Sequence, residues 1–368
     1  MRSVRWSLLF VATCASLATG ATSQLVAPAS AAWWSEARDG RALVVYEDGK
    51  LLFEQYAGGV TRDTGFAIAS ITKSFASVLA ACAVRDGLIR DFDELVADSL
   101  TEWKGDNNKS KITYRDLLSM SSGLDGGTSF IVPTYAEAVR AAATVPPGVR
   151  FQYGPNPYQA FGAALERKLA SRNQTVTDYL QTALLAPIGI RVSAWIDALK
   201  GQPQFPSGAA LTAPELMKFG EFLRNRGFAN GKQLIPSDLL AECLKVSSTN
   251  PGYRVGFYGP SPTTPGGIDM FWCAGAGGQR LYVLPEYGLT ILRYAVSTRD
   301  IDDGEFQKVL FPAWTGNIGV GCRGSRGIPR LTSYANTVPF VGALDYALTI
   351  LSCPENAIGI YLLGASQH

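Results

Sequence analysis

The stretch FAIASITKSFASVLAACAV, residues 66–84, decides how the whole chain is interpreted. It is apolar on nearly every face of a helix, so it predicts a long buried helix that ends near Asp86 and Gly87. Ser70 stands at the start of this helix and Lys73 follows one turn later. A serine in front of an apolar helix is most often an N-cap.

Lys73 argues for a chemical role of Ser70. A capping box has Glu or Gln three residues after the cap, and the helix dipole disfavours a cation in the first turn. Residues three apart share a helix face, and the apolar surroundings would partly desolvate the ammonium. Desolvation lowers the pKa of a lysine, and a neutral amine beside a hydroxyl is a usable base. Two interpretations stay open here, a helix cap and a nucleophile with its own base.

The histidine content restricts the chemistry further. The chain has 368 residues and one histidine, His368, which is its last residue and a poor place for a positioned base. A Ser-His-Asp triad, a Cys-His pair or a histidine-ligated zinc site is therefore not expected. The formal net charge is +2 without a long run of one sign, so nothing indicates a nucleic-acid partner.

The N-terminus indicates export. Residues 1–23 contain two arginines, a short apolar run and then small residues, which is the layout of a secretory signal peptide. We therefore expect a secreted or periplasmic protein with no membrane span after cleavage, because the apolar run is too short to cross a bilayer. The residues before Cys14 match a lipid-attachment box poorly, so a lipid anchor is not expected.

The order of patterns along the chain predicts an α+β fold. Two strand-like runs flank a turn in residues 41–58, and mainly helical patterns then continue to about residue 250. Strand-like runs return at residues 253–259, 268–275, 279–285 and 289–296. Both chain ends would then build one antiparallel sheet, with a helical lobe inserted between them. We assign the sheet lobe to residues 32–75 plus 251–316, the helical lobe to 76–250, and a C-terminal extension of unknown role to 317–368.

Two further stretches could serve Ser70. RFQYGPNPYQAFG, residues 150–162, offers Tyr153 in a proline-fixed loop, where a phenol could relay a proton or simply pack under the loop. WCAGAGGQRLYVLP, residues 272–285, places small residues at a strand edge. Such a stretch is either a strand bulge or a place where a substrate approaches the backbone and an N–H group binds an oxyanion.

With these stretches in view, the chain resembles the serine β-lactamase and D,D-peptidase superfamily from about residue 40 to 315. The closer likeness is to its class C-like branch, which includes esterases and 6-aminohexanoate-oligomer hydrolases. FAIASITKSFAS resembles the first family box, with Ser70 as nucleophile and Lys73 as its base. FQYGPNPYQAFG resembles the second box, with Tyr153 as the proton relay. GAGGQRLYVLPEYGL resembles the third box and contributes the substrate-binding residues Gly275, Ala276 and Gly277.

The resemblance implies a β-lactamase/transpeptidase-like fold, an antiparallel sheet flanked by helices with an inserted helical lobe. It implies acylation of Ser70, an oxyanion hole formed by the N–H groups of Ser70 and Gly278, and deacylation by water. It implies no metal and no cofactor.

The chain departs from the family pattern at two points. The second box usually has Asn two residues after the tyrosine, where this chain has Pro155, and Asn156 either substitutes for it or is only a turn residue. The third box lacks its usual cation, which Gly275 cannot supply. Arg254 and Arg280 are candidate replacements, although an arginine on a surface strand is usually just solvated.

Three hypotheses follow. The first is an exported serine hydrolase of a small ester or amide, which the missing third-box cation favours. The second is a D,D-carboxypeptidase or β-lactamase in which an arginine replaces that cation. The third is a catalytically silent relative that binds ligands in the same cleft. The substrate and the oligomeric state stay open.

Overall fold

The computed structural model describes residues 26–128, 131–260, 269–297 and 301–311, and the backbone of short strands outside these ranges. The chain divides into two compact units, Pro28–Phe306 and Met1–Ala27 with Gln307–His368, which are described separately. The predicted signal peptide and C-terminal extension lie outside the described residues except for strands. These are β1 Phe10–Thr13, which pairs with β17 Ile358–Tyr361, and the three-stranded sheet of β14 Asn317–Val320, β15 Arg330–Ser333 and β16 Leu348–Leu351.

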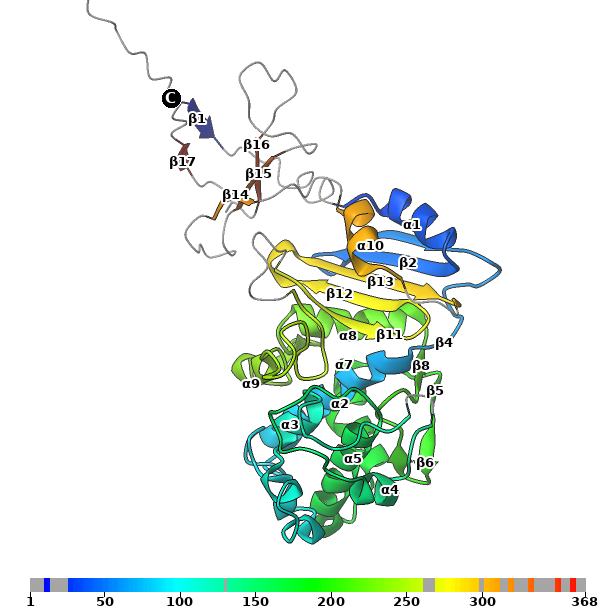
Figure 1. The fold of residues 1–368 in the computed structure, drawn as a ribbon. Coiled ribbons are helices and arrows are strands. Elements are labelled where there is room, and N and C mark those ends of the chain that lie inside the picture. Colours follow the sequence, from blue (N-terminus) through cyan, green and yellow to red (C-terminus); the bar gives the residue numbers. More distant parts are fainter. Residues whose placement is uncertain are drawn as a thin grey trace, which may run out of the picture. The chain divides into compact units, whose positions relative to one another are not determined.

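The unit Pro28–Phe306 contains an antiparallel sheet with the strand order β11-β12-β13-β2-β3. Its strands are β2 Gly40–Glu47, β3 Lys50–Tyr56, β11 Phe271–Gly275, β12 Gln279–Leu284 and β13 Leu289–Ala295. Because β13 pairs with β2, early and late segments of the chain share one sheet, which confirms the predicted α+β fold. Strands β12 and β13 are buried along their whole length. Helix α1 (Pro28–Glu36) and the start of α10 (Asp303–Leu310) cover one face, and α8 (Ala213–Arg224) covers the other (Figure 1).

The expected strand at residues 253–259 is wrong. Only isolated bridges occur there, Tyr253 with Tyr258 and Tyr258 with Trp272. Gly256 interrupts any extended run, since its φ is +82° and a Cβ on it would come within 2.1 Å of Ser77 Oγ. The aromatic residues of this stretch therefore follow a tight turn against α2 and do not alternate across a strand.

Helix α2, Thr72–Arg85, is the centre of the helical part, and every residue from Thr72 to Ala83 is buried. Three of the surrounding helices begin with a capping box whose threonine bonds an acidic residue three positions on, which explains where they start.

The boundaries expected for the sheet lobe and the helical lobe stay predictions. The other helices of this part are α3 Tyr114–Leu118, α4 Tyr135–Arg140, α5 Asn156–Leu169, α6 Val176–Leu180, α7 Ala186–Ile188 and α9 Ser237–Glu242, and a π-helical turn, Gln181–Leu185, separates α6 from α7.

A small sheet fixes the entry into α2. Strand β4, Phe66–Ala67, pairs with β8, Ala209–Leu211, which also pairs with β5, Ala194–Trp195. The N–H of Ile68 donates to the carbonyl of Ala209 at 3.0 Å. Segments about 140 residues apart in sequence are thereby held side by side just before Ser70.

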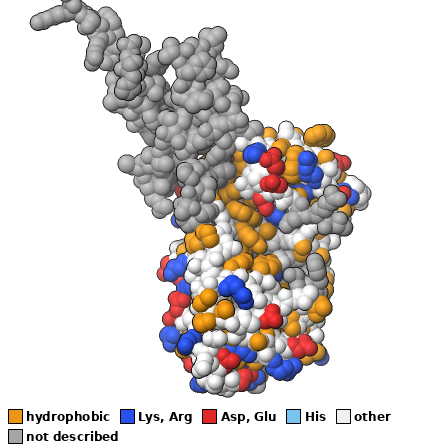
Figure 2. Space-filling view, in the orientation of Figure 1, with side chains coloured by type: hydrophobic (Ala, Val, Ile, Leu, Met, Phe, Trp, Pro, Cys, Tyr) orange, Lys and Arg blue, Asp and Glu red, His pale blue; other side chains and the backbone are white. Residues whose placement is uncertain are grey.

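The surface of the described residues carries no single-sign patch on the face drawn in Figure 2, where Lys and Arg alternate with Asp and Glu over the helical part. Hydrophobic side chains gather on this face where the helical part meets the sheet. Within the described part of the chain, none of the helices combines the length and the apolar character that a membrane crossing requires.

Phe75 tests the packing between α2 and α8. Its ring is stacked on Phe219 with 3.8 Å between centroids and meets Trp195 edge-on at 5.9 Å. We expect Phe75→Ala to lower the free energy of unfolding by about 3–5 kcal/mol because it leaves a cavity in the core. Urea titration measures this, with Trp33→Ala as the control, since Trp33 is 74% exposed and its loss should cost no more than about 0.5 kcal/mol. Equal effects of the two substitutions would contradict the assignment of Phe75 to the core.

Candidate active site

Ser70 lies in a strained, reachable turn. It belongs to the 3₁₀ turn Ala69–Ile71 that precedes α2, and Ala69 has a φ of +47°. A residue with a Cβ pays about 1–2 kcal/mol for this left-handed conformation. The N-cap positions of the turn and of α2 are Ile68 and Ile71, so Ser70 caps neither element. Its half-buried side chain is thus available for another role.

Lys73 brings its amine to Ser70. Lys73 Nζ lies 3.1 Å from Ser70 Oγ and 2.8 Å from the carbonyl oxygen of Pro206. Only 4% of the Lys73 surface is exposed. The lysine therefore does not extend along the helix into water, and its amine is fixed between one hydroxyl and one carbonyl.

Burial lowers the pKa of Lys73, and the interaction with the Tyr153 phenol opposes this shift in part. A charged amine taken out of water is costly unless a counter-charge accompanies it. The Ser70 hydroxyl and the Pro206 carbonyl oxygen, which both contact Nζ, are neutral groups. Compared with water, this environment shifts the amine towards its neutral form, which is the form that can accept a proton.

Two tyrosines flank the amine. Lys73 Nζ lies 4.7 Å from the ring centroid of Tyr153 and 5.7 Å from that of Tyr158. Tyr158 is fully buried and its hydroxyl donates to the carbonyl oxygen of Leu118 at 2.7 Å. Burial also raises the pKa of Tyr158. Tyr153 is half-buried, so it is the phenol of the two that a substrate can reach.

The loop that carries Tyr153 is fixed by a close approach of two glycines. A Cβ on Gly154 would come within 2.0 Å of the carbonyl oxygen of Gly126, so only glycine fits there. The N–H of Asn156 donates to Gly126 O at 3.1 Å, and its side-chain amide donates to Asp125 O at 2.8 Å. These bonds support the interpretation of Asn156 as the turn residue that ties the two loops together.

The glycine-rich segment, residues 275–278, makes close contacts at both of its ends. A Cβ on Gly275 would come within 2.3 Å of the carbonyl oxygen of Ile68 and 3.3 Å of Ala69 Cβ, so Gly275 lies against the chain just before Ser70. Gly278 is buried, and a Cβ on it would come within 2.3 Å of Arg293 Nη1. Ala276 and Gly277 form the intervening turn, in which Ala276 is exposed. Gly275 and Gly278 thus border different parts of the molecule.

The two arginines considered as substitutes for the third-box cation have structural partners. Arg280 is buried and forms a two-point ion pair with Asp303, at 2.8 and 3.0 Å. Arg254 is half-buried and donates to the carbonyl oxygens of Pro251 and Pro260, both at 2.8 Å. Arg280 is therefore not a solvated surface residue, and its charge is directed into the protein.

Two site residues were missed by reasoning from the sequence. Pro206 contributes only a backbone carbonyl, and it is 133 residues from Lys73, so no local pattern could indicate it. Tyr158 lies in the same quoted stretch as Tyr153, and its position inside an apolar helix would have indicated a buried contact of α5 with α2.

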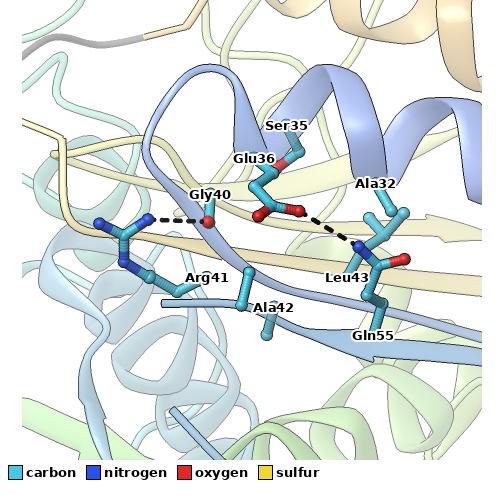
Figure 3. A pocket seen from close by; sticks show the side chains of 9 residues that line it. Ala32, Ser35, Glu36, Gly40, Arg41, Ala42, Leu43 and Gln55 are labelled. Carbon is cyan, nitrogen blue, oxygen red and sulfur yellow. Dashed lines mark hydrogen bonds between the residues drawn. The ribbon is translucent and has the colours of Figure 1, made fainter. Parts of the chain in front are cut away.

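A separate small hollow is lined by α1, β2 and β3, including Ala32, Ser35 and Leu43. Figure 3 shows Gln55 there, with its amide directed at the Glu36 carboxylate at 3.4 Å. It contains neither Ser70 nor Lys73. Among the described residues, His, Cys, Asp and Glu side chains form no group of three or more that could hold a metal ion.

Comparison with known proteins identifies the family. The sequence model of the family described as Beta-lactamase matches residues 23–308. The chain belongs to the Beta-lactamase family. This membership confirms the predicted resemblance and the β-lactamase/transpeptidase-like fold, and it makes the chain a member of a family of serine hydrolases. No curated protein matches the chain in sequence.

Solved structures share the fold of this Beta-lactamase family member. A Bacillus anthracis protein assigned as a 6-aminohexanoate-dimer hydrolase is 20% identical, with a TM-score of 0.63 over 75% of this chain and 78% of that one. A penicillin-binding protein homologue from Caulobacter crescentus is 17% identical, with a TM-score of 0.62 over 77% and 96%. SurE bound to D-Leu is 23% identical, with a TM-score of 0.62 over 91% and 88%. At these identities the likeness shows the fold alone.

The burial of Lys73 predicts a specific dependence of stability on pH. Its pKa in the folded protein lies below the ordinary 10.5, so between these two values the unfolded chain binds a proton that the folded protein does not. The free energy of unfolding of the wild type, minus that of Lys73→Met, should therefore rise with pH up to about 10.5 and level off above it. Urea titrations at a series of pH values measure this difference. A difference that stays constant or falls with pH would show that folding does not lower the pKa of the amine.

Proposed function

We propose that this chain is a serine hydrolase that cleaves a small ester or amide through an acyl-enzyme on Ser70. The observation that carries the proposal is the 3.1 Å contact of a buried amine, Lys73 Nζ, with Ser70 Oγ. The Pro206 carbonyl accepts an N–H of the amine at 2.8 Å. A neutral amine held in this way keeps its lone pair for the Ser70 proton.

The proposed reaction has two halves. Ser70 Oγ bonds to the acyl carbon of the substrate while its proton passes to Lys73 Nζ. The tetrahedral intermediate then breaks the bond to the leaving group, which receives the proton through the Tyr153 phenol. In the second half, water attacks the acyl carbon, its proton follows the same route in reverse, and the bond from the acyl carbon to Oγ breaks.

The oxyanion would be bound by the N–H of Ser70 and by an N–H of the glycine-rich segment. The environment of Gly275 favours the N–H of Ala276 over that of Gly278 for the second donor. The carbonyl oxygen of Gly275 accepts from Arg280 Nη1 at 3.2 Å, and in a trans peptide the next N–H points the opposite way. The N–H of Ala276 therefore points away from Arg280, at the end of the edge strand that lies against Ile68.

The surroundings support a substrate without an obligatory carboxylate. Tyr153 belongs to a group of rings with Phe151 and Tyr253, at centroid distances of 6.4 and 6.3 Å. The half-buried rings of Phe151 and Tyr153 offer apolar contact near the acyl group, and the buried ring of Tyr253 packs behind them. The charge of Arg280, in contrast, is neutralised by Asp303. We therefore place an ester or amide hydrolase ahead of a D,D-carboxypeptidase or β-lactamase. Gly275, Ala276, Gly277 and Asn156 remain proposed as residues that border the bound substrate.

We further propose export of the protein, on the basis of the layout of residues 1–23 alone. Expression of the full chain in a bacterial host, followed by mass measurement of the product in the periplasm or medium, tests this proposal. An intact N-terminus retained in the cytoplasm would contradict it.

Substitution of the proposed nucleophile is the decisive test of the function. With a short-chain p-nitrophenyl ester, we expect Ser70→Ala to lower the rate by at least about 10³-fold, because no other nucleophile lies at this position. Tyr153→Phe should lower kcat by about 10²-fold, since it removes a proton-transfer group. Tyr114→Phe is the matched control. It removes a phenol that forms a 2.8 Å hydrogen bond with Ser99 and does not contact Lys73. This substitution should leave the rate within about twofold.

Three other outcomes would each change the conclusion. Equal rates in the wild type and Ser70→Ala would show that Ser70 is not the nucleophile. Turnover of a penicillin in place of the ester would favour the β-lactamase alternative. Covalent labelling of Ser70 by penicillin without turnover of any ester would favour the silent relative.

A further inference from the structure

Two arginines lie directly opposite each other in the middle of the sheet. Arg280 on β12 and Arg293 on β13 are register partners, and they are only 3% and 0% exposed. Like charges on directly opposite residues destabilise an antiparallel pair. Both side chains are nevertheless engaged with polar groups, and several of these belong to the segment from Gly275 to Gln279.

Arg293 links this segment to the N-terminal helix. Its Nη1 donates to the carbonyl oxygen of Gly278 at 2.6 Å. Its Nε donates to Ser35 Oγ at 2.8 Å and its Nη2 to the carbonyl oxygen of Arg38 at 2.8 Å. One rigid guanidinium thus joins the turn to α1 and to the residues after α1, which a lysine with its single ammonium could not do with the same geometry.

Arg280 holds the other end of the same turn. Its Nη1 donates to the carbonyl oxygens of Gly275 at 3.2 Å and Gln279 at 3.0 Å. The ion pair with Asp303 at the start of α10 fixes the guanidinium in this position, and the hydroxyl of Tyr282 also donates to Asp303.

We propose that Arg280 and Arg293 are positioning residues that hold the peptide groups of the turn from Gly275 to Gln279, and with them the second N–H donor of the oxyanion hole. The inference rests on the proposed function. Fixing a carbonyl oxygen fixes the peptide plane, and the N–H on the other side of the plane is fixed with it. Through the carbonyl of Gly275, Arg280 acts directly on the N–H of Ala276. Through the carbonyl of Gly278, Arg293 fixes the peptide that closes the turn, so it supports this donor indirectly. Hydrogen bonds from a charged donor are stronger than those between neutral groups, so they hold the planes more firmly.

The turn itself is built to receive Arg293. Gly278 has a φ of +81°, and a Cβ on it would meet the guanidinium at 2.3 Å. Glycine is therefore required for the backbone angle and also for the space that the arginine occupies. Gln279 adds a further constraint, because its side chain donates to Ala295 O at 2.6 Å and accepts from Ala295 N at 3.1 Å.

Stability alone gives a weak reason for two buried arginines here. A buried charged group is often replaceable by an apolar residue of similar volume without loss of stability. A preorganised oxyanion hole, in contrast, depends on donors that stay in place while charge develops on the substrate. The positioning role therefore accounts for the side chains at a place where packing by itself does not require them.

The experiment compares Arg293→Met, Arg293→Lys, Arg280→Met and Arg280→Lys with the wild type. The control is Arg115→Met, which breaks ion pairs with Asp93 and Glu242 away from the turn. Four quantities are measured. A p-nitrophenyl ester gives kcat, KM and the burst amplitude that reports the folded active fraction, and a phenylboronic acid gives its inhibition constant. The boronic acid bonds to Ser70 Oγ and forms a tetrahedral adduct that uses the oxyanion hole.

The expected result is a fall in kcat of about 10- to 100-fold per active site for the four turn variants, with KM changed less than about threefold. The inhibition constant of the boronic acid should rise by the same factor as kcat/KM falls, because both report binding of the tetrahedral species. The control variant should keep kcat/KM and the inhibition constant of the boronic acid, and should lose only stability.

Unchanged kcat per active site in Arg293→Lys and Arg280→Lys would overturn the inference, even if the methionine variants do not fold. A fall confined to the burst amplitude would also overturn it, since this reports loss of folded protein. An inactive wild type, or a Ser70→Ala variant as active as the wild type, would instead reject the proposed function.

Discussion

The arrangement around Ser70 depends on one constraint, the burial of the Lys73 amine at the start of an apolar helix. Lys73 is 4% exposed, and its Nζ contacts the hydroxyl of Ser70 and the backbone carbonyl of Pro206. A buried ammonium with such partners is costly, so the environment shifts the lysine towards its neutral form. The carbonyl of Pro206 reaches the amine because β8 pairs with β4, immediately before the turn that holds Ser70. The small sheet β4-β8-β5 thus places Lys73, the proposed base, as well as Ser70, the proposed nucleophile.

Local signals allowed Ser70 and Lys73 to be recognised from the sequence. Their spacing of three puts both on one helix face, and the apolar residues that follow imply the burial that alters the pKa of the lysine. The hairpin of β2 and β3 and the strands β11 to β13 were also predicted, because alternating apolar residues and turn signals are local features. The acceptor at Pro206 could not be predicted, since it is a backbone atom brought in by a pairing across more than 130 residues.

The region from residue 253 to 259 shows why periodicity failed where it did. Its aromatic and β-branched residues match a strand pattern, yet Gly256 adopts a φ of +82° and packs against Ser77 of α2. Tyr253 and Tyr258 then meet each other edge-on at 5.0 Å, and Tyr253 also contacts the ring of Tyr153. The ring of Tyr253 thus packs against the phenol near Lys73, and this is a tertiary contact that a pattern along the chain does not reveal.

The role of the charge on Arg280, in the third box, is likewise determined by tertiary contacts. Reasoning from the sequence considered Arg280, with Arg254, as a candidate replacement for a missing substrate-binding cation. Its guanidinium instead faces Asp303 and the carbonyl oxygens of Gly275 and Gln279. A charge that already has a carboxylate partner attracts a substrate carboxylate only weakly, because the pair is close to neutral at a distance. The same guanidinium can still act on the reaction through the backbone, whose peptide dipoles it orients. Specificity in this protein would then come from apolar contacts near Tyr153, and the arginines would contribute to rate without contributing to substrate binding.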